Sequence, residues 1–339
     1  MADNFYGIWN TDAEVRHPGA ADLKACHEDE TYYIPFETSF FRKPDSYLTE
    51  EEVNALIESG DLDATCVQIT CLVASGLYLT EPQIRAHLAL RGEVLTPEEL
   101  KEKIDLLLRC NFLRRVECCL RSRVTLACYC TGVQGNAVAK SADVHLHRGN
   151  CYMSKQKRMQ LNKGVVDEPQ EIKRVVQANM VILGLLNAGI PMAHYGIRET
   201  LRTDDGGISD SIVRTIGTMQ LDRANHLVLE VIRKDSDWEA VWSKIDRFSR
   251  MIKRPDFLET VTISLEGLPQ LIICGEDDTH NRQIHQMLER RGILAQNPDM
   301  TVLYTTDQQV RKDPLEFYAF EETGEKLFFS LGETNQEAA

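Results

Sequence analysis

The 339-residue chain is long enough for two domains, and its 43% hydrophobic and 27% charged residues are typical of a folded, water-exposed protein. It contains no apolar run approaching the roughly 18 residues of a membrane-spanning helix, and its N-terminus does not resemble a signal peptide. We therefore expect a cytoplasmic protein with no membrane contact, whose ten cysteines are reduced thiols.

The formal net charge of −14 is distributed unevenly along the chain. Residues 1–63 carry 15 acidic and 4 basic side chains, whereas residues 101–165 carry 13 basic and 4 acidic ones. A basic stretch in an acidic protein can still bind nucleic acid, because the local field acts on phosphate. The acidic head could instead fold back on the basic stretch or bind a protein partner, and the sequence leaves these alternatives open.

The first part of the chain shows little periodicity before its first helices. Residues 1–47 predict an irregular acidic arm with a few strand-like residues, part of which packs against a domain through its aromatic residues. A short helix is expected from Leu48 to about Gly60, and a second from Asp63 to Gly76.

Two more helices are predicted, each from a capping-box pattern at its N-terminus. Thr80 precedes Gln83 by three residues, and Thr96 precedes Glu99 by three, which is the capping-box pattern of a helix N-terminus. A proline in each first turn fits, since those amides have no helical partner. Helices are therefore predicted over about 82–90 and 97–109, the second with an apolar stripe of Leu100, Ile104, Leu107 and Leu108.

A basic strand pair follows these helices. Residues 112–116 and 123–130 predict two strands that form a hairpin with its tip at Arg121. Three helices followed by such a hairpin resemble a winged helix-turn-helix, which we expect over residues 48–131. Residues 132–167 then predict a basic, weakly structured connector broken by glycines.

The expected contact with double-stranded DNA lies mainly on the hairpin and the connector. Helix 97–109, the usual reading helix, exposes Glu98, Glu99, Glu102 and Asp105 opposite its apolar stripe, and these carboxylates would repel phosphate. A winged helix used only for protein contact is the alternative. The candidate nucleic-acid-binding residues are Lys101, Lys103, Arg109, Arg114, Arg115, Arg121, Arg123, Lys155, Lys157 and Arg158.

The C-terminal half alternates strands and helices. A long helix is expected over 168–188, strands over 211–218, 226–232, 271–274 and 301–305, and helices over 238–251 and 280–292. This alternation predicts a largely parallel sheet flanked by helices, in an α/β domain over 168–325 with a tail at 326–339.

An acidic pair and a lysine make this half resemble the PD-(D/E)XK nuclease core, with its αβββαβ order. Asp210 precedes one strand, Glu230 ends the apolar run of the next, and Lys244 lies on the following helix. Such a site holds Mg²⁺ with its carboxylates and uses the lysine to orient water. The lysine usual two residues after the second acid is replaced by Ile232, so an inactive domain of this fold is favoured over an active nuclease. No cofactor is expected unless the domain is active, when Mg²⁺ would be required.

Other candidate sites have weaker patterns. Cys118, Cys119, Cys128, Cys130, His145, His147 and Cys151 lie close in sequence, but without the spacings that commonly bring zinc ligands together, so the strand cysteines are expected to be buried apolar residues. The acids of residues 276–278 are expected to favour the N-terminus of the helix after them, with a metal site as the lesser alternative.

Together, the three-helix unit with its hairpin, the acid-bearing strands, the helix WEAVWSKIDRFSRMI and the segment LPQLIICGEDDTHNRQIHQMLERRG are similar to the replication-relaxation family of plasmids and integrative elements. The resemblance covers about residues 60–320. It implies a winged helix before a PD-(D/E)XK-type domain, and a DNA-binding accessory in the replication, transfer or regulation of a mobile element. The acidic face of helix 97–109 departs from this pattern and puts base reading by Lys101 and Arg109 in doubt. The sequence does not fix the oligomeric state, and a homodimer stays open.

Overall fold

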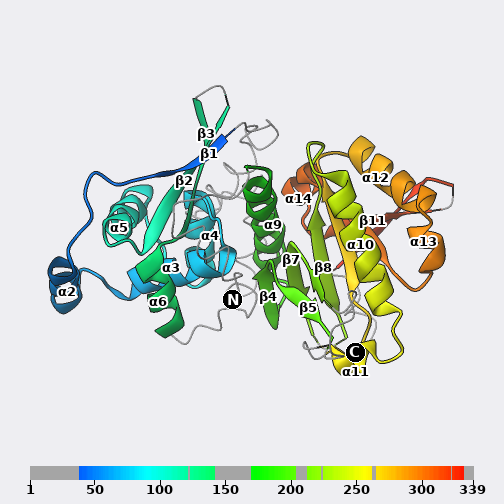
Figure 1. Ribbon diagram of the computed structural model, residues 1–339, viewed down its shortest axis with the longest axis horizontal. Helices are drawn as coiled ribbons and strands as arrows, with labels where there is room; N and C mark the ends of the chain where they lie inside the picture. The colour runs from blue at the N-terminus through cyan, green and yellow to red at the C-terminus, as the bar shows by residue number, and fades with distance from the viewer. Residues whose placement is uncertain are drawn as a thin grey trace. The chain divides into compact units, whose positions relative to one another are not determined.

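The computed structural model describes residues 38–120, 123–141, 169–203, 212–222, 224–261, 265–321 and 323–331 (Figure 1). The chain has a mixed α/β fold that divides into two compact units, residues 1–179 and residues 180–339. Helix α9 (Pro169–Asn187) begins in the first unit and ends in the second. Each unit has its own sheet and its own hydrophobic core.

The first unit includes the helices α2 (Glu50–Ser59), α3 (Ala64–Gly76), α4 (Glu81–Leu90), α5 (Pro97–Arg109) and α6 (Val133–Ser141). Of these, α4 and α5 begin where the capping signals at Thr80 and Thr96 predict. Thr49, Thr80 and Thr96 each form a complete capping box, and the Asp63 side chain caps α3. These start sites are local, because each cap satisfies amides within three residues of itself.

The core of the first unit lies between α3, α4 and α5. Ile69, Ile84 and Ile104 from these helices are completely or almost completely buried there. The predicted stripe of α5 is confirmed, since its buried residues are Leu100, Ile104, Leu107 and Leu108. The opposite face of α5 is therefore exposed to solvent.

A three-stranded antiparallel sheet completes the first unit, in the order β1 (Thr38–Arg42), β2 (Leu113–Leu120) and β3 (Arg123–Thr131). Leu79, between α3 and α4, bridges to Tyr129 of β3 through hydrogen bonds of 3.1 and 2.8 Å. Residues 1–37 of the predicted arm lie outside the described residues. Strand β1 lies near the end of the arm, and its pairing with β2 could not be predicted because a strand of five residues carries too little periodicity to be read alone.

The predicted connector also begins differently. Its first residues form α6, which starts close to the backbone of residues 111 and 112. A Cβ atom at Gly132 would lie 2.1 Å from the Asn111 carbonyl oxygen, and one at Gly135 would lie 1.9 Å from that of Phe112. These glycines, which the sequence presents as breaks, permit a close backbone approach instead.

The second unit is built on a seven-stranded sheet in the order β12-β11-β10-β9-β8-β7-β4. The strands are β4 (His194–Ile197), β7 (Gly217–Gln220), β8 (His226–Val231), β9 (Gln270–Gly275), β10 (Val302–Thr306), β11 (Glu316–Phe320) and β12 (Lys326–Ser330). Among the strands that the structure describes, the β8–β9 and β9–β10 pairs are parallel and the other pairs of this sheet are antiparallel. The predicted largely parallel sheet is therefore wrong, because short connections such as 221–225 and 321–325 return the chain antiparallel.

One face of this sheet carries the larger part of the core. Val228, Ile273 and Tyr304 lie on it and pack with α10 (Trp238–Ile252) and α12 (Asp278–Arg290), which Figure 1 shows on the same side of the sheet. Leu229 and Ile272 point to the other face and are also fully buried. Both faces of the central strands are thus covered, as parallel strands require.

Smaller elements account for the remaining differences from the predicted order. They are β5 (Thr200–Arg202), β6 (Ile212–Arg214), α11 (Phe257–Thr260), α13 (Ile293–Gln296) and α14 (Asp307–Lys312). The strand predicted over 211–218 is two strands, since β6 pairs with β5 and β7 joins the main sheet. The segment predicted as a tail begins with β12.

Candidate functional site

Helix α5 presents few cations that are available to a ligand. Lys101 and Arg109 are exposed and make no ion pair within the described residues. Lys103, in contrast, lies with its Nζ 2.6 Å from Asp63 Oδ2. Burial opposes ionisation of Asp63, but the hydrogen bonds from Lys103 and from the Cys66 amide together outweigh it and lower the pKa of the carboxyl group. Lys103 therefore forms an ion pair that joins α5 to the N-terminus of α3 and is not available to a ligand.

The exposed face of α5 is acidic, as the sequence predicts. Glu98, Glu102 and Asp105 are exposed along it. Glu99 is also exposed, and its carboxylate accepts the Thr96 amide at 2.7 Å as part of the capping box, which lowers its pKa. This face carries more negative than positive charge, so it is a poor surface for a polyanion.

The two arginines at the start of β2 are held by neighbouring side chains. The Arg114 guanidinium lies 5.4 Å from the centre of the Phe41 ring, and Arg115 Nε lies 3.0 Å from Glu117 Oε1. The Arg115 side chain keeps 38% of its surface exposed, whereas Glu117 keeps 8%. Arg115 can therefore still meet a ligand from solvent.

The end of β1 and the residue after it add two cations that were not selected from the sequence. Arg42 pairs directly with Arg115 in the antiparallel register, and both Arg42 and Lys43 are exposed. Within the described residues neither Arg42 nor Lys43 makes an ion pair. Since β1 lies about 70 residues before β2 in the chain, no local pattern could have shown that these cations meet.

The remaining predicted nucleic-acid contacts lie outside the described residues or have no described side chain. Arg121, Lys155, Lys157 and Arg158 belong to the first group, and Arg123 is described only as the first residue of β3. The candidate interface is therefore the face of the sheet that carries Arg42 and Arg115, together with Lys43 next to Arg42, which we call the β1–β2 basic surface. Arg114 precedes Arg115 in β2 and points to the opposite face of the sheet.

In the second unit, the structure brings two of the three predicted catalytic residues together. Lys244 Nζ on α10 lies 2.6 Å from Glu230 Oε2 on β8, and the Ile216 amide donates to Glu230 Oε1 at 3.3 Å. The Glu230 side chain is 3% exposed and that of Lys244 is 22% exposed. Asp210, the third residue, lies outside the described residues.

A second buried carboxylate lies on the same side of the sheet. Glu199 accepts hydrogen bonds from the Thr218 hydroxyl and contacts His194 Nε2 at 2.8 Å. Gly196 leaves the space that this carboxylate occupies, since a Cβ atom there would lie 2.5 Å from it. The sequence analysis missed Glu199, which lies in a turn between two short strands and has no motif around it.

His226 begins β8 near this carboxylate. It is fully buried, and among the described residues neither of its ring nitrogens has a hydrogen-bond partner. Burial lowers the pKa of His226 to about 4, although Glu199 acts in the opposite direction. Among the described residues, however, no group of three His, Cys, Asp or Glu side chains converges to hold a metal ion. The four cysteines of β2 and β3 are buried free thiols, and His145, His147 and Cys151 lie outside the described residues.

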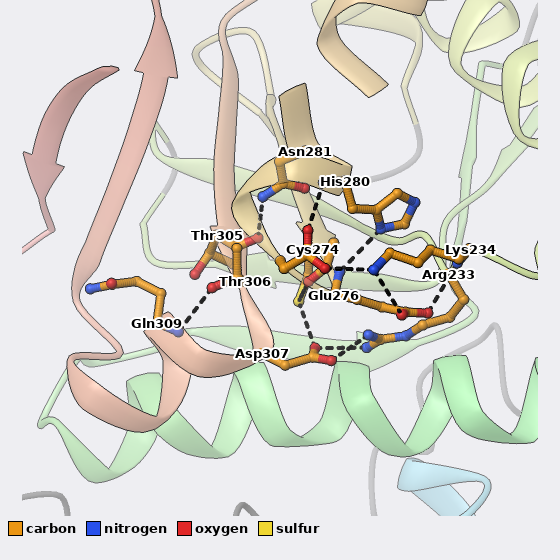
Figure 2. A network of polar contacts seen from close by, with 12 residues as sticks. Arg233, Lys234, Cys274, Glu276, His280, Asn281, Thr305, Thr306, Asp307 and Gln309 are labelled. Carbon is orange, nitrogen blue, oxygen red and sulfur yellow. Dashed lines mark hydrogen bonds and ion pairs between the residues drawn. The ribbon is translucent and has the colours of Figure 1, made fainter. Parts of the chain in front are cut away.

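A third polar cluster joins the carboxyl ends of β8, β9 and β10, where open α/β sheets commonly bind ligands (Figure 2). Arg233 follows β8 and forms a buried, bidentate ion pair with Asp307, with Nη2 2.8 Å from Oδ1. Burial opposes the charge on Arg233, but Asp307 outweighs it and raises the pKa of the guanidinium. The Cys274 thiol of β9 also donates to Asp307.

On the exposed side of this cluster, the charged groups also form ion pairs and hydrogen bonds with one another. Lys234 Nζ lies 2.6 Å from Asp277 Oδ2, and the Lys234 amide donates to Glu276 at 3.0 Å. Asp277 caps α12 by accepting the His280 amide at 2.8 Å, which confirms the predicted role of this acidic segment. Figure 2 shows Lys234, Glu276 and His280 close to one another on this side of the cluster. We interpret the cluster as a cross-link between strand ends, because its carboxylates are already engaged by internal cations and amides.

No family model, no curated protein and no solved structure matches this chain. None of the described helices is long and apolar enough to span a bilayer.

Proposed function

We propose that this protein is a DNA-binding accessory or regulatory protein of a mobile element, and that its first unit is a winged helix-turn-helix that contacts duplex DNA. The order of α3, the Leu79 bridge, α4, α5 and the β2–β3 hairpin supports this interpretation. In such a fold the hairpin reaches DNA phosphates beside the reading helix.

The observation that carries the proposal is the β1–β2 basic surface. Arg42 and Lys43 extend the cations of β2, and both are exposed and without an internal counter-charge among the described residues. Phosphate contacts of this kind provide affinity and orientation but not sequence readout. The acidic face of α5 argues against dense base contacts, so we propose a binding mode with weak sequence preference.

For the second unit we propose a PD-(D/E)XK-like fold without nuclease activity. The order α9, β4, β7, β8, α10, β9 supports the αβββαβ topology, with the β5–β6 pair as an insertion. Inactivity is supported by the contacts of Glu230, whose carboxylate is buried and engaged by Lys244 and the Ile216 amide. A carboxylate held in this way has little capacity left for a hydrated Mg²⁺ ion.

Fluorescence anisotropy with a labelled duplex tests the DNA-binding proposal. Full-length protein should bind at low salt, and an Arg42→Ala, Lys43→Ala variant should bind more weakly to every duplex sequence tested. A Lys253→Ala, Arg290→Ala variant is the matched control, because both residues are exposed cations of the second unit. Absence of binding at low salt would exclude the proposal and favour a protein-interaction role for the first unit.

A metal-dependent endonuclease is the second candidate, supported by the direct contact between Glu230 and Lys244. The nuclease would need Asp210 as its second acid. Nicking of supercoiled plasmid in Mg²⁺ or Mn²⁺ that disappears in Glu230→Gln would establish this alternative. Absence of nicking in the unmodified protein would exclude it.

A further inference from the structure

The outermost strand of the seven-stranded sheet, β12, exposes three consecutive large apolar side chains. Leu327, Phe328 and Phe329 are 48%, 52% and 41% exposed. Along one edge β12 pairs with β11, and within the described residues no strand pairs along its other edge. An exposed apolar edge strand is a site at which another chain can add a strand.

This edge lacks the features that usually prevent pairing. Residues 326–330 contain no proline, glycine or bulge, and Lys326 is their sole charged residue. Lys326 is also neutralised, because its Nζ lies 2.5 Å from Asp278 Oδ2 and 4.3 Å from the centre of the Tyr318 ring. Lysine protects an edge strand when its free charge meets an incoming strand, and here that charge is engaged.

We propose that β12 is the dimer interface of this protein, formed by antiparallel pairing with β12 of a second copy about a twofold axis at Phe328. A twofold axis perpendicular to a strand gives an antiparallel pair in which the same residues serve both partners. Residues of the two copies then pair as 328 with 328, 327 with 329, and 326 with 330. The two sheets join into one continuous sheet across the axis.

The chemistry of the strand matches this register. Phe328 pairs with itself across the axis on the sheet face that carries Tyr318, while Leu327 meets Phe329 of the other copy on the opposite face. Aromatic and branched cross-strand pairs are among the most favourable in antiparallel sheets. Lys326 faces Ser330 of the other copy, so no like charges are opposed. A strand of different sequence would need an apolar triplet of its own and an uncharged residue opposite Lys326, and a second copy has both in Leu327–Phe329 and Ser330.

Sedimentation velocity of the full-length protein at tens of micromolar tests the proposal. The unmodified protein should sediment as a dimer, and Phe328→Lys should sediment as a monomer because it places two like charges on the twofold axis. Ile57→Lys is the matched control, since Ile57 is 54% exposed on α2 in the first unit, and this variant should remain dimeric. Circular dichroism should show that both variants remain folded. A monomeric unmodified protein would overturn the proposal.

Single cysteine substitutions test the register. Phe328→Cys should form a disulfide between copies under mild oxidation, because directly opposed residues have Cβ atoms about 4.5–5.5 Å apart. Leu327→Cys should cross-link much more slowly, since the same residue of the other copy is displaced by two positions. The other described cysteines are buried and should not interfere. Equal cross-linking of the two variants, or faster cross-linking of Leu327→Cys, would overturn the proposed axis.

Discussion

Arg42 of β1 and Arg115 of β2 are directly opposite each other in an antiparallel pair, and the carboxylate of Glu117 lies beside Arg115 with an Oε1–Nε distance of 3.0 Å. Like charges in directly opposed positions destabilise a sheet. In the free protein Glu117 offsets the positive charge of Arg115. In the proposed complex a DNA phosphate would offset the charges of both Arg42 and Arg115.

Replacing Glu117 should therefore change stability and DNA affinity in opposite directions. Glu117→Gln removes the internal counter-charge, so the free energy of unfolding should fall by about 0.5–1 kcal/mol, the range for a partly exposed ion pair. The same change frees Arg115 for phosphate, so affinity should rise a few-fold at low salt. Thermal unfolding and anisotropy measure the two effects, with Glu259→Gln, an exposed acid of the second unit, as the control. Weaker DNA binding by Glu117→Gln would contradict the assignment of this surface.

The capping box of α5 should contribute to stability but not to the basic surface. Thr96 Oγ accepts the Glu99 amide at 3.2 Å, and the Glu99 carboxylate accepts the Thr96 amide at 2.7 Å. Thr96→Ala should lower the free energy of unfolding by about 1 kcal/mol, whereas Thr96→Ser, which keeps the cap, should lower it much less. Urea denaturation measures this difference. Equal effects of the two variants would show that the cap does not stabilise the helix.

The Glu230–Lys244 pair should behave as a coupled structural unit. Lys244→Met leaves a buried carboxylate without its cation, and we expect it to lower the free energy of unfolding by about 2–3 kcal/mol, since Lys244 is partly exposed and solvent reduces the loss. Glu230→Gln retains an acceptor for the Ile216 amide and should be milder. In the double variant most of the Lys244→Met effect should disappear. Simple additivity in this double-mutant cycle would indicate that the two side chains do not stabilise each other.

His226 should make the protein less stable in acid. Its folded pKa of about 4 lies below the ordinary value of 6.5, so the unfolded chain binds a proton first as pH falls. The resulting loss begins near pH 6.5 and continues to about pH 4, with a slope of at most ~1.4 kcal/mol per pH unit for one group.

A nontitrating residue at this position should flatten that slope. His226→Leu also removes two buried ring nitrogens that lack partners among the described residues, so its stability at neutral pH should be equal to or greater than that of the unmodified protein. Urea denaturation at several pH values between 4 and 7 tests both points. His87, whose pKa is lowered to about 3 by burial, remains in the variant and should leave a residual slope. An unchanged slope between pH 6.5 and 4 would contradict the role assigned to His226.

The parts of the fold that could be predicted from the sequence are those fixed by nearby residues. The capping boxes at Thr80 and Thr96 located α4 and α5 within one residue of their observed starts, because a cap and its amides lie within one turn. Helix α10 also begins at the predicted residue and ends one residue after the predicted end. The contact of Glu230 with Lys244 also agrees with the predicted grouping, since one strand and the next helix carry them.

The parts that could not be predicted depend on pairing between distant segments. Strand β1 is short, and its pairing with β2 is set by tertiary structure, so Arg42 and Lys43 were not selected as interface residues. Glu199 was missed because its partners Thr218 and His194 come from two different strands. The mixed direction of the sheet was missed because β8 follows β7 through a short turn that an alternating pattern does not distinguish from a crossover. In addition, the antiparallel strands β11 and β12 were not predicted as strands.

The salt dependence of duplex affinity tests the central proposal most directly. Each phosphate neutralised by a protein cation contributes about −0.9 to the slope of log affinity against log salt concentration. If Arg42 and Lys43 both contact phosphate, Arg42→Ala, Lys43→Ala should make the slope less steep by about 2, while Lys253→Ala, Arg290→Ala should leave it unchanged. An identical slope for the unmodified protein and the Arg42→Ala, Lys43→Ala variant would contradict the proposal that the β1–β2 basic surface binds DNA.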